Sequence, residues 1–378
     1  MLEIILDREC HNGRHPVQLE AWHWRFEVRA DDRHYGYYFH CTLHAQEAGE
    51  ALVEITPDSK LLPESGRSFE RHRPTTVWLR RQGDWKRHPV EPDTHLGRLR
   101  IRFKMEAGEM VSMSRMNPYP YSAVLVHLAG LSNSPQTHRG TLGKSAEWRD
   151  IPFVEIGNGS TRVLVLAGQH PAEFGGVQAV VGMAEWLTSS LPQAQAICDK
   201  FCVTLIPILN PDGNVSGCCG HNRRGEDLYR AFPNAAQGVA PVAKEAACLW
   251  KWIETHNPAL TLNFHTYPQP SLAGSFPWEG LYTPPDSAFA SEAARSRQRL
   301  LDQWLAWETD GLSHSGDFVH HVPASLEAQI AALGIPSVFY ELQDAVGPFR
   351  HRRTGVHVLR TALKALFSFH NEPPKSCP

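Results

Sequence analysis

The stretch Thr161–Gly176 reads TRVLVLAGQHPAEFGG, and it decides how the fold of the whole chain is interpreted. Its apolar run Val163–Leu166 has the β-branched content of a strand that is buried on both faces. The pair Gly175–Gly176 then leads into a helical pattern, so His170 and Glu173 fall between a strand and a helix. This order predicts both side chains at the carboxyl end of a sheet strand, where open α/β sheets bind ligands. A His and a Glu at this spacing can bind one metal ion, although the spacing alone is more typical of a loop histidine beside a solvated glutamate.

Length and composition indicate a globular protein of two domains. The chain has 378 residues, of which 42% are hydrophobic and 20% charged, and its formal net charge is −3. This charge predicts no nucleic-acid partner and no anionic membrane surface as a partner. No run of about 18 apolar residues is present, and Glu3 and Asp7 interrupt the apolar start, so we expect neither a membrane span nor a secretory signal. The eight cysteines form no C-x-x-C pair, which favours reduced thiols in a cytoplasmic protein.

The pattern of the chain changes near residue 130. Residues 1–129 contain short runs that alternate with period two and end at turn-forming residues, which predicts an antiparallel β-sandwich domain. Residues 130–150 are polar and turn-rich, and we expect them to connect two domains. Residues 151–378 alternate strands with helices, which predicts an α/β domain with a mixed, mostly parallel sheet covered by helices. The strands expected here are Val163–Leu166, Val203–Leu209, Leu260–Phe264 and Ser337–Leu342, and the helices are Gly176–Ser189, Val242–His256, Asp286–Trp307, Ser325–Leu333 and Val356–Phe369.

Polar side chains lie at or near the end of each of the four expected strands. The residues at these strand ends are, in chain order, His170 and Glu173, Asn210–Gly213, His265, and Glu341. Two histidines and one carboxylate form a three-ligand set that leaves zinc an open position for water, and a further acidic residue can take a proton from that water. Taken singly, His265 is more simply a core histidine and Glu341 a salt-bridge partner. Neither interpretation explains all four strand ends in this order.

Several motifs together resemble the zinc metallocarboxypeptidase family that is typified by carboxypeptidase A. They are His170-Pro171-Ala172-Glu173, Asn210-Pro211-Asp212-Gly213, Gly225–Phe232, His265 and Glu341. The β-rich first part ends in Met116–Ser122, which is similar to a P-Y-x-Y-S stretch in the domain that precedes the catalytic unit of cytosolic carboxypeptidases. The resemblance implies a carboxypeptidase-like catalytic domain over residues 151–378.

The resemblance also implies roles for individual residues. His170, Glu173 and His265 would hold one Zn²⁺ ion, and Glu341 would act as the general base toward a metal-bound water. Arg230 would grip the terminal carboxylate of the substrate, because a guanidinium offers a planar fork to a carboxylate.

Three positions depart from the family pattern. Tyr229 stands where the family has an asparagine before its arginine, which alters part of the expected carboxylate clamp. Gly220 stands where the family has a carbonyl-polarising arginine, and His320 lies where the family keeps a tyrosine. Since loss of one oxyanion donor can lower a rate about a hundredfold or more, these changes favour an unusual substrate or weak peptidase activity. Three nearby residues, any one of which would have to replace the missing arginine, are His221, Arg223 and Arg224.

We therefore expect a cytoplasmic zinc metallocarboxypeptidase that hydrolyses C-terminal peptide or isopeptide bonds. One alternative is an amidohydrolase or deacylase that acts on N-acyl amino acids at the same zinc site, and another is a catalytically weak member that binds peptide tails. The partner is then a peptide or a small acylated amino acid, and the oligomeric state is not indicated. The tract Phe349–Arg353 is expected to be a solvated basic loop, and with the cytosolic relatives it suggests acidic tails as substrates.

Overall fold

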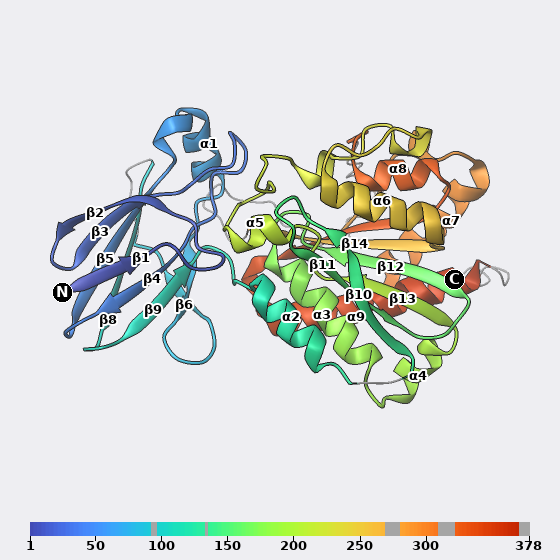
Figure 1. The fold of residues 1–378 in the computed structure, drawn as a ribbon, viewed down its shortest axis with the longest axis horizontal. Helices are drawn as coiled ribbons and strands as arrows, with labels where there is room; N and C mark the ends of the chain where they lie inside the picture. Colours follow the sequence, from blue (N-terminus) through green and yellow to red (C-terminus); the bar gives the residue numbers. More distant parts are fainter. Residues whose placement is uncertain (92–96, 133–134, 269–279, 309–321, 370–378) are drawn as a thin grey trace.

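The computed structural model describes residues 1–378 apart from 92–96, 133–134, 269–279, 309–321 and 370–378. Two units lie side by side, a β-rich unit from the first part of the chain and a larger α/β unit (Figure 1). Of the helices in the described ranges, none combines the length and the apolar character that crossing a bilayer requires.

The β-rich unit contains two sheets that enclose one apolar core. Strand β8 (Leu99–Met105) shows the predicted alternation, because every second side chain is buried. The five-stranded sheet has the order β1 (Leu2–Ile5), β4 (His40–Ala45), β9 (Met110–Ser114), β6 (Thr76–Arg80), β7 (Lys86–Pro89), and the four-stranded sheet has β2 (Arg14–Glu20), β3 (His23–Glu27), β5 (Gly49–Thr56), β8. The predicted antiparallel sandwich is confirmed, except that β3 and β5 pair in parallel.

The larger unit is built on a seven-stranded sheet. Its strands in spatial order are β10 (Thr137–Lys144), β11 (Asp150–Ile156), β13 (Phe201–Ile206), β12 (Thr161–Ala167), β14 (Leu260–Tyr267), β16 (Ser337–Gln343) and β15 (Gly280–Tyr282). The strands β13, β12, β14 and β16 run parallel, whereas β10, β11 and β15 join the sheet in antiparallel pairs. The predicted mixed, mostly parallel sheet is confirmed, and the three antiparallel strands were not predicted.

Helices cover both faces of this sheet (Figure 1). Val163 and Val165 of β12 pack in one core with α3 and α9, whereas Leu164 and Leu166 pack in another with α6 and α8. Successive side chains of a strand point to opposite faces, so β12 is apolar throughout because both faces are covered. The helices are α1 (Glu64–Arg71) in the β-rich unit and α2 (Tyr121–Gly130), α3 (Phe174–Leu187), α4 (Pro192–Cys198), α5 (Pro211–Val215), α6 (Lys244–His256), α7 (Glu292–Glu308), α8 (Leu326–Ala332) and α9 (Gly347–Ser368).

Two segments correct the sequence-based expectations. The residues of α2 were expected to be β but are helical: Pro120 stands at the N-cap, and Val124 and Leu128, one turn apart, are buried. Helix α9 begins at Gly347, well before the predicted start, so the basic tract 349–353 is helical and not a loop. Within that tract Arg352 pairs with Glu185 of α3 at 2.8 Å.

The division of the chain into domains stays a prediction. Helix α2 lies in the predicted first domain, and strand β10 lies in the predicted connecting segment 130–150. In the structure α2 contacts α3 and α5, and β10 is paired with β11 in the seven-stranded sheet. These contacts favour a division that precedes α2.

Buried polar contacts join the two units. Asp344, directly after β16, accepts a hydrogen bond from Trp78 Nε1 of β6 at 2.8 Å. Asp31 of the β-rich unit accepts hydrogen bonds from the backbone N–H groups of Gly220 and His221 at 2.7 and 2.9 Å. The second contact brings the segment around Asp31 against the loop that follows α5, and this loop borders the predicted metal ligands.

Candidate metal centre

The three predicted metal ligands come from two neighbouring parallel strands. Strand β12 ends at Ala167, and Gly168 turns the chain with a positive φ of 68°. The turn brings His170 to the edge of the sheet and Glu173 to the position just before α3. His265 lies in β14, which pairs in parallel with β12. Because the carboxyl ends of adjacent parallel strands meet at one edge of a sheet, these distant residues come together.

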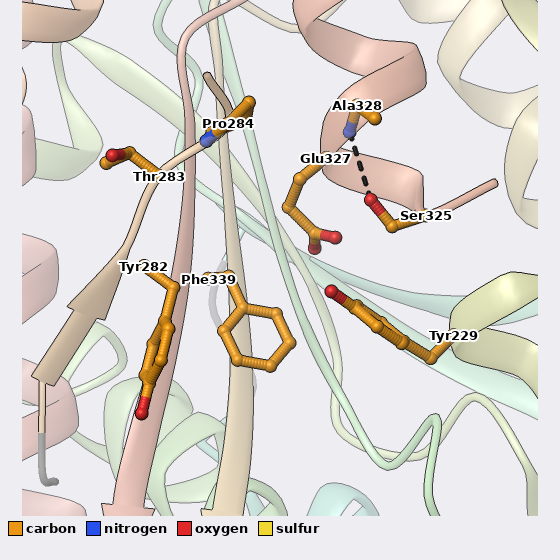
Figure 2. Close-up of a pocket in the computed structure, with 8 residues that line it drawn as sticks. All are labelled: Tyr229, Tyr282, Thr283, Pro284, Ser325, Glu327, Ala328 and Phe339. Carbon is orange, nitrogen blue, oxygen red and sulfur yellow. Dashed lines mark hydrogen bonds between the residues drawn. The ribbon is translucent and has the colours of Figure 1, made fainter. Parts of the chain in front are cut away.

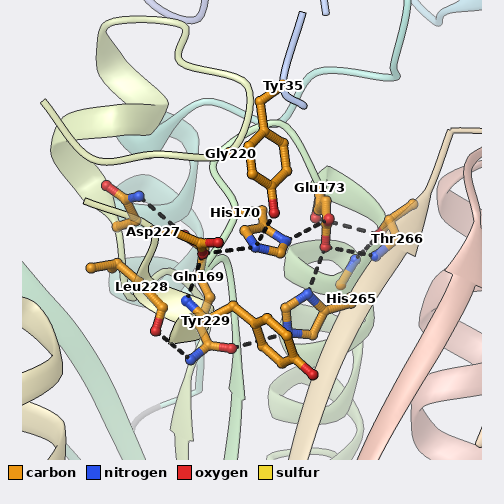
Figure 3. A network of polar contacts seen from close by, with 12 residues as sticks. Tyr35, Gln169, His170, Glu173, Gly220, Asp227, Leu228, Tyr229, His265 and Thr266 are labelled. Carbon is orange, nitrogen blue, oxygen red and sulfur yellow. Dashed lines mark hydrogen bonds and ion pairs between the residues drawn. The ribbon is translucent and has the colours of Figure 1, made fainter. Parts of the chain in front are cut away.

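The ligand atoms of the three residues converge (Figure 3). His170 Nδ1 lies 2.7 Å from Glu173 Oε1, and His265 Nδ1 lies 2.8 Å from Glu173 Oε2. One ligand atom from each residue lies within 4.8 Å of the others, and all three residues are buried. Two imidazole nitrogens and a carboxylate oxygen are a donor set that zinc uses in catalytic sites.

The electrostatics of the cluster also suit a cation. Burial opposes ionisation of Glu173, but His170 and His265 outweigh it and hold the pKa of this carboxyl well below its usual range. Burial likewise lowers the pKa of His170, but Glu173 and Asp227 together raise it well above its usual value. A positive charge is therefore stabilised where the three side chains meet, and the residues present fit a zinc ion.

Side chains behind the cluster orient the two imidazoles. The outer nitrogen of His170, Nε2, lies 3.3 Å from Asp227 Oδ1 and 3.2 Å from the Tyr35 hydroxyl. His265 Nε2 lies 3.0 Å from Gln169 Oε1. Such contacts set the ring orientation and tautomer of metal-binding histidines. None of these three partners was predicted as a site residue. Gln169 directly precedes the motif that begins at His170 and Asp227 lies within the motif Gly225–Phe232, whereas no sequence signal marks Tyr35.

Glu341, the predicted general base, lies directly opposite His265. Strands β14 and β16 pair with His265 and Glu341 in register, so both side chains project on the same side of the sheet. Glu341 Oε2 is buried and has no hydrogen-bond partner in the described part of the chain. Burial raises the pKa of Glu341 well above its usual value, the charge of Glu173 raises it further, and His170 opposes the shift.

The predicted carboxylate clamp lies at the mouth of the cluster. Arg230 is the last residue of the short helical turn Leu228–Arg230. Its side chain is 58% exposed, and its Nε lies 3.3 Å from Asp227 Oδ2. Tyr229 is buried, and its ring centroid lies 5.9 Å from that of His170 and 5.7 Å from that of His265. Thus Tyr229 borders the cluster, while Arg230 keeps a guanidinium beside it that is open to solvent.

Tyr35 of the β-rich unit lies next to Gly220, the position at which the family has a carbonyl-polarising arginine. A Cβ atom added to Gly220 would lie 2.3 Å from the Tyr35 ring, so only glycine leaves room for this ring. His221 packs edge-on against the same ring at 5.2 Å, and its Nε2 lies 3.5 Å from Asp32 Oδ2. Of the three residues that could replace the arginine, His221 therefore contacts Tyr35, and the Tyr35 hydroxyl in turn contacts His170.

The remaining predicted residues do not reach the cluster or are not described. Arg223 is exposed, and its Nε lies 3.4 Å from Glu147 Oε1. Arg224 is exposed, and its backbone N–H donates to Asn222 Oδ1 at 2.9 Å. His320 lies outside the described residues.

Replacing Tyr35 with Phe is expected to weaken zinc binding about tenfold. Loss of an outer partner of a metal-binding histidine typically lowers metal affinity or activity about 10- to 100-fold, and Asp227 still contacts His170 Nε2 in this variant. The measurement is competition for zinc against a chelating dye. The matched control is Tyr38→Phe, which removes a buried hydroxyl that donates to the Cys10 carbonyl at 2.7 Å in the same unit. Equal zinc affinities of the two variants would show that the Tyr35 hydroxyl does not support the centre.

A buried His–Glu–His cluster at the carboxyl edge of this mixed sheet defines a candidate zinc centre. Residues 124–345, more than half of the chain, match the family described as zinc carboxypeptidase, and the chain belongs to this family. The resemblance that the motifs indicated is thus confirmed. Zinc is the cofactor of the family, and the His170, Glu173 and His265 cluster is where this chain offers one ion a site.

Curated relatives carry the name of cytosolic carboxypeptidases. Cytosolic carboxypeptidase 6 of Caenorhabditis elegans is 27% identical over 224 aligned positions, and the match covers 54% of this chain and 48% of that protein. Cytosolic carboxypeptidase 4 of Mus musculus is 29% identical over 174 aligned positions, and the match covers 40% of this chain and 15% of that protein. The matches therefore span less than half the length of these relatives.

Solved structures share the fold over nearly the whole chain. A metallo-carboxypeptidase from Burkholderia cenocepacia superposes with a TM-score of 0.79 at 17% identity and covers 98% of this chain and 100% of its own. A metallo-carboxypeptidase from Pseudomonas aeruginosa, in complex with (2-guanidinoethylmercapto)succinic acid, superposes with a TM-score of 0.76 at 17% identity, covering 96% and 100%. The combination of a β-rich unit with a carboxypeptidase-like α/β unit is thus shared with these proteins.

Proposed function

We propose that this protein is a carboxypeptidase that hydrolyses C-terminal peptide or isopeptide bonds with one zinc ion. The observation that carries the proposal is the convergence of His170, Glu173 and His265, with Glu341 opposite His265. Arg230 beside this cluster supports a substrate that ends in a carboxylate. A free carboxylate next to the scissile bond is what distinguishes the substrate of a carboxypeptidase from that of an endopeptidase.

Each residue has a defined part in the reaction. When bound, zinc supplies a Lewis acid that polarises a carbonyl and lowers the pKa of water. Arg230 binds the terminal carboxylate through a charge-assisted, two-pronged contact. Glu341 takes a proton from the attacking water while the hydroxyl adds to the carbonyl carbon, and it returns the proton to the leaving nitrogen as the C–N bond breaks. The raised pKa of Glu341 suits this exchange, because it makes the carboxylate a stronger base.

Two alternatives on the same site stay open. An amidohydrolase or deacylase that acts on N-acyl amino acids would use the same ligands, and Arg230 would hold the small carboxylate. The departures from the family pattern at Tyr229 and Gly220 support this alternative. A member that only binds peptide tails is disfavoured, because the three ligands and Glu341 are all present.

A substrate panel separates these functions. We expect the zinc-loaded protein to release single residues from peptides with a free C-terminus and to leave the same peptides with an amidated C-terminus intact. A chelator should stop the release, and added zinc should restore it. Faster hydrolysis of N-acyl amino acids than of peptides would establish the deacylase instead. Peptide binding without hydrolysis of either substrate class would establish the binding member.

A cytoplasmic location is part of the proposal. The described cysteines, which are seven of the eight, form no disulfide bond, as expected for a reducing compartment. The names of the cytosolic carboxypeptidase relatives point the same way.

A further inference from the structure

A groove on the surface of the larger unit runs between helices α3 and α9. The two helices lie side by side (Figure 1), and their close approach requires glycine at position 182, because a Cβ atom there would lie 2.5 Å from Cβ of Arg352. The groove has a volume of about 520 Å³ and is open to solvent. An open groove of this size suits a segment of polypeptide, whereas sites for small molecules bury most of their ligand.

The groove lies away from the metal centre. Glu173 stands at the N-cap of α3, whereas Glu185 and Trp186, which line the groove, lie at the opposite end of this helix. The helix has 14 residues, and a rise of about 1.5 Å per residue gives it a length of roughly 20 Å. A ligand in the groove therefore need not touch the metal-binding side chains.

Each helix contributes an aromatic side chain to the groove. Phe349 in the first turn of α9 is 74% exposed, and Trp186 of α3 is half-buried. The guanidinium of Arg353 lies over the Phe349 ring, 5.7 Å from its centroid, and that of Arg360 lies over the Trp186 ring at 5.8 Å. Single exposed apolar side chains are common on protein surfaces, but here apolar and cationic groups line the same groove.

The groove is positively charged, although the whole chain has a formal net charge of −3. Its lining includes the three arginines Arg352, Arg353 and Arg360 and a single carboxylate, Glu185. Nη1 of Arg352 lies 2.8 Å from both carboxylate oxygens of Glu185, so these two charges offset each other. Arg353 and Arg360 form no ion pair with any residue that the structure describes, and two positive charges therefore remain for a ligand.

We propose that this groove binds an acidic segment of a partner protein that also carries an apolar side chain. Carboxylates of the segment would pair with Arg353 and Arg360, and its apolar side chain would pack against Phe349 and Trp186. Charge complementarity selects this occupant. A second copy of the chain that docked symmetrically through the same groove would bring its arginines against these arginines, and like charges repel. The surface acts independently of the reaction proposed for the metal centre.

The test uses three labelled peptides with an amidated C-terminus, in which leucine alternates with glutamate, glutamine or lysine. Their binding to the full chain is followed by fluorescence anisotropy. We expect the glutamate peptide to bind at least about tenfold more tightly than the glutamine peptide, and the lysine peptide to bind most weakly. Added salt should weaken binding of the glutamate peptide, because it screens exposed charges. Equal affinities of the glutamate and glutamine peptides would overturn the proposal.

Two variants assign the binding to the groove. Arg353→Glu and Phe349→Ala should each lower the affinity for the glutamate peptide about tenfold, the first by charge reversal and the second by loss of an apolar contact. Both side chains are exposed, so the melting temperature should stay unchanged. The matched control is Arg67→Glu at an exposed position of α1 in the β-rich unit, which should keep the affinity. Unchanged affinity in either groove variant would overturn the proposal.

Two further measurements exclude the other occupants and the other site. Removal of zinc with a chelator should leave binding of the glutamate peptide unchanged, since the groove lies apart from the metal centre. Loss of binding together with zinc would place the peptide at the metal centre and overturn the proposal. Sedimentation measures the oligomeric state, and a dimer that Phe349→Ala dissociates would assign the groove to a second copy instead. None of these results depends on whether the protein cleaves peptides.

Discussion

Glu341→Gln is expected to lower turnover by about 100- to 10,000-fold, the range that a positioned acid–base group contributes. The amide cannot accept a proton from the attacking water, although it fills the same space opposite His265. Zinc content should stay at one ion per chain, because Glu341 is not part of the ligand cluster. The measurements are kcat on the best peptide of the panel and metal analysis of the same preparation.

Two results would contradict this role. Turnover equal to that of the unmodified protein would remove Glu341 from the reaction. Loss of zinc together with turnover would mean that Glu341 supports the centre and does not act on the substrate. Because Glu341 Oε2 has no hydrogen-bond partner in the described part of the chain, the substitution breaks no contact of that oxygen.

His265→Ala is expected to remove zinc and turnover together. Loss of an outer partner already lowers metal affinity up to about 100-fold, so loss of a direct ligand should exceed this figure. The change also leaves Glu173 Oε2 without the imidazole that it contacts at 2.8 Å. We expect the dialysed variant to hold far less than one zinc per chain and to show no hydrolysis of any peptide in the panel.

The control for this variant is a histidine that is distant from the centre. His138 in β10 is exposed, so His138→Ala should retain zinc and activity. Stoichiometric zinc in His265→Ala would contradict the ligand assignment. Addition of zinc should raise the melting temperature of the unmodified protein but not that of the variant, since a ligand stabilises only a state that binds it.

The sequence predicted those parts of the site that depend on local pattern. The run Val163–Leu166 is apolar because both faces of β12 are covered, and this property can be read from consecutive residues. The turn that follows this strand places His170 and Glu173 at the strand end, so their spacing in the sequence indicated two ligands of one metal ion. His265 and Glu341 were predicted for the same reason, because each lies on a short, apolar, parallel strand.

Other features depended on neighbours that are remote in sequence. The apolar residues of α2 suit a strand or a helix equally, and the burial of Val124 and Leu128 one turn apart distinguishes the two only after folding. Likewise, the basic composition of the tract 349–353 suggests a solvated loop. In the structure the tract is the first part of α9, and this helix packs against α3.

By itself the sequence determined the four parallel strands of the larger sheet, the donor set for zinc and the family, because these follow from periodicity and from short motifs. Tertiary structure alone decided that Tyr35 of the β-rich unit stands in the space left by Gly220, with its hydroxyl on His170. It also decided that the carboxylate of Glu327 lies near the aromatic side chains of Tyr229 and Phe339 (Figure 2). The physical reason is that a contact between units, or the charge that lines a pocket, depends on which surfaces meet in space, and no local pattern records that.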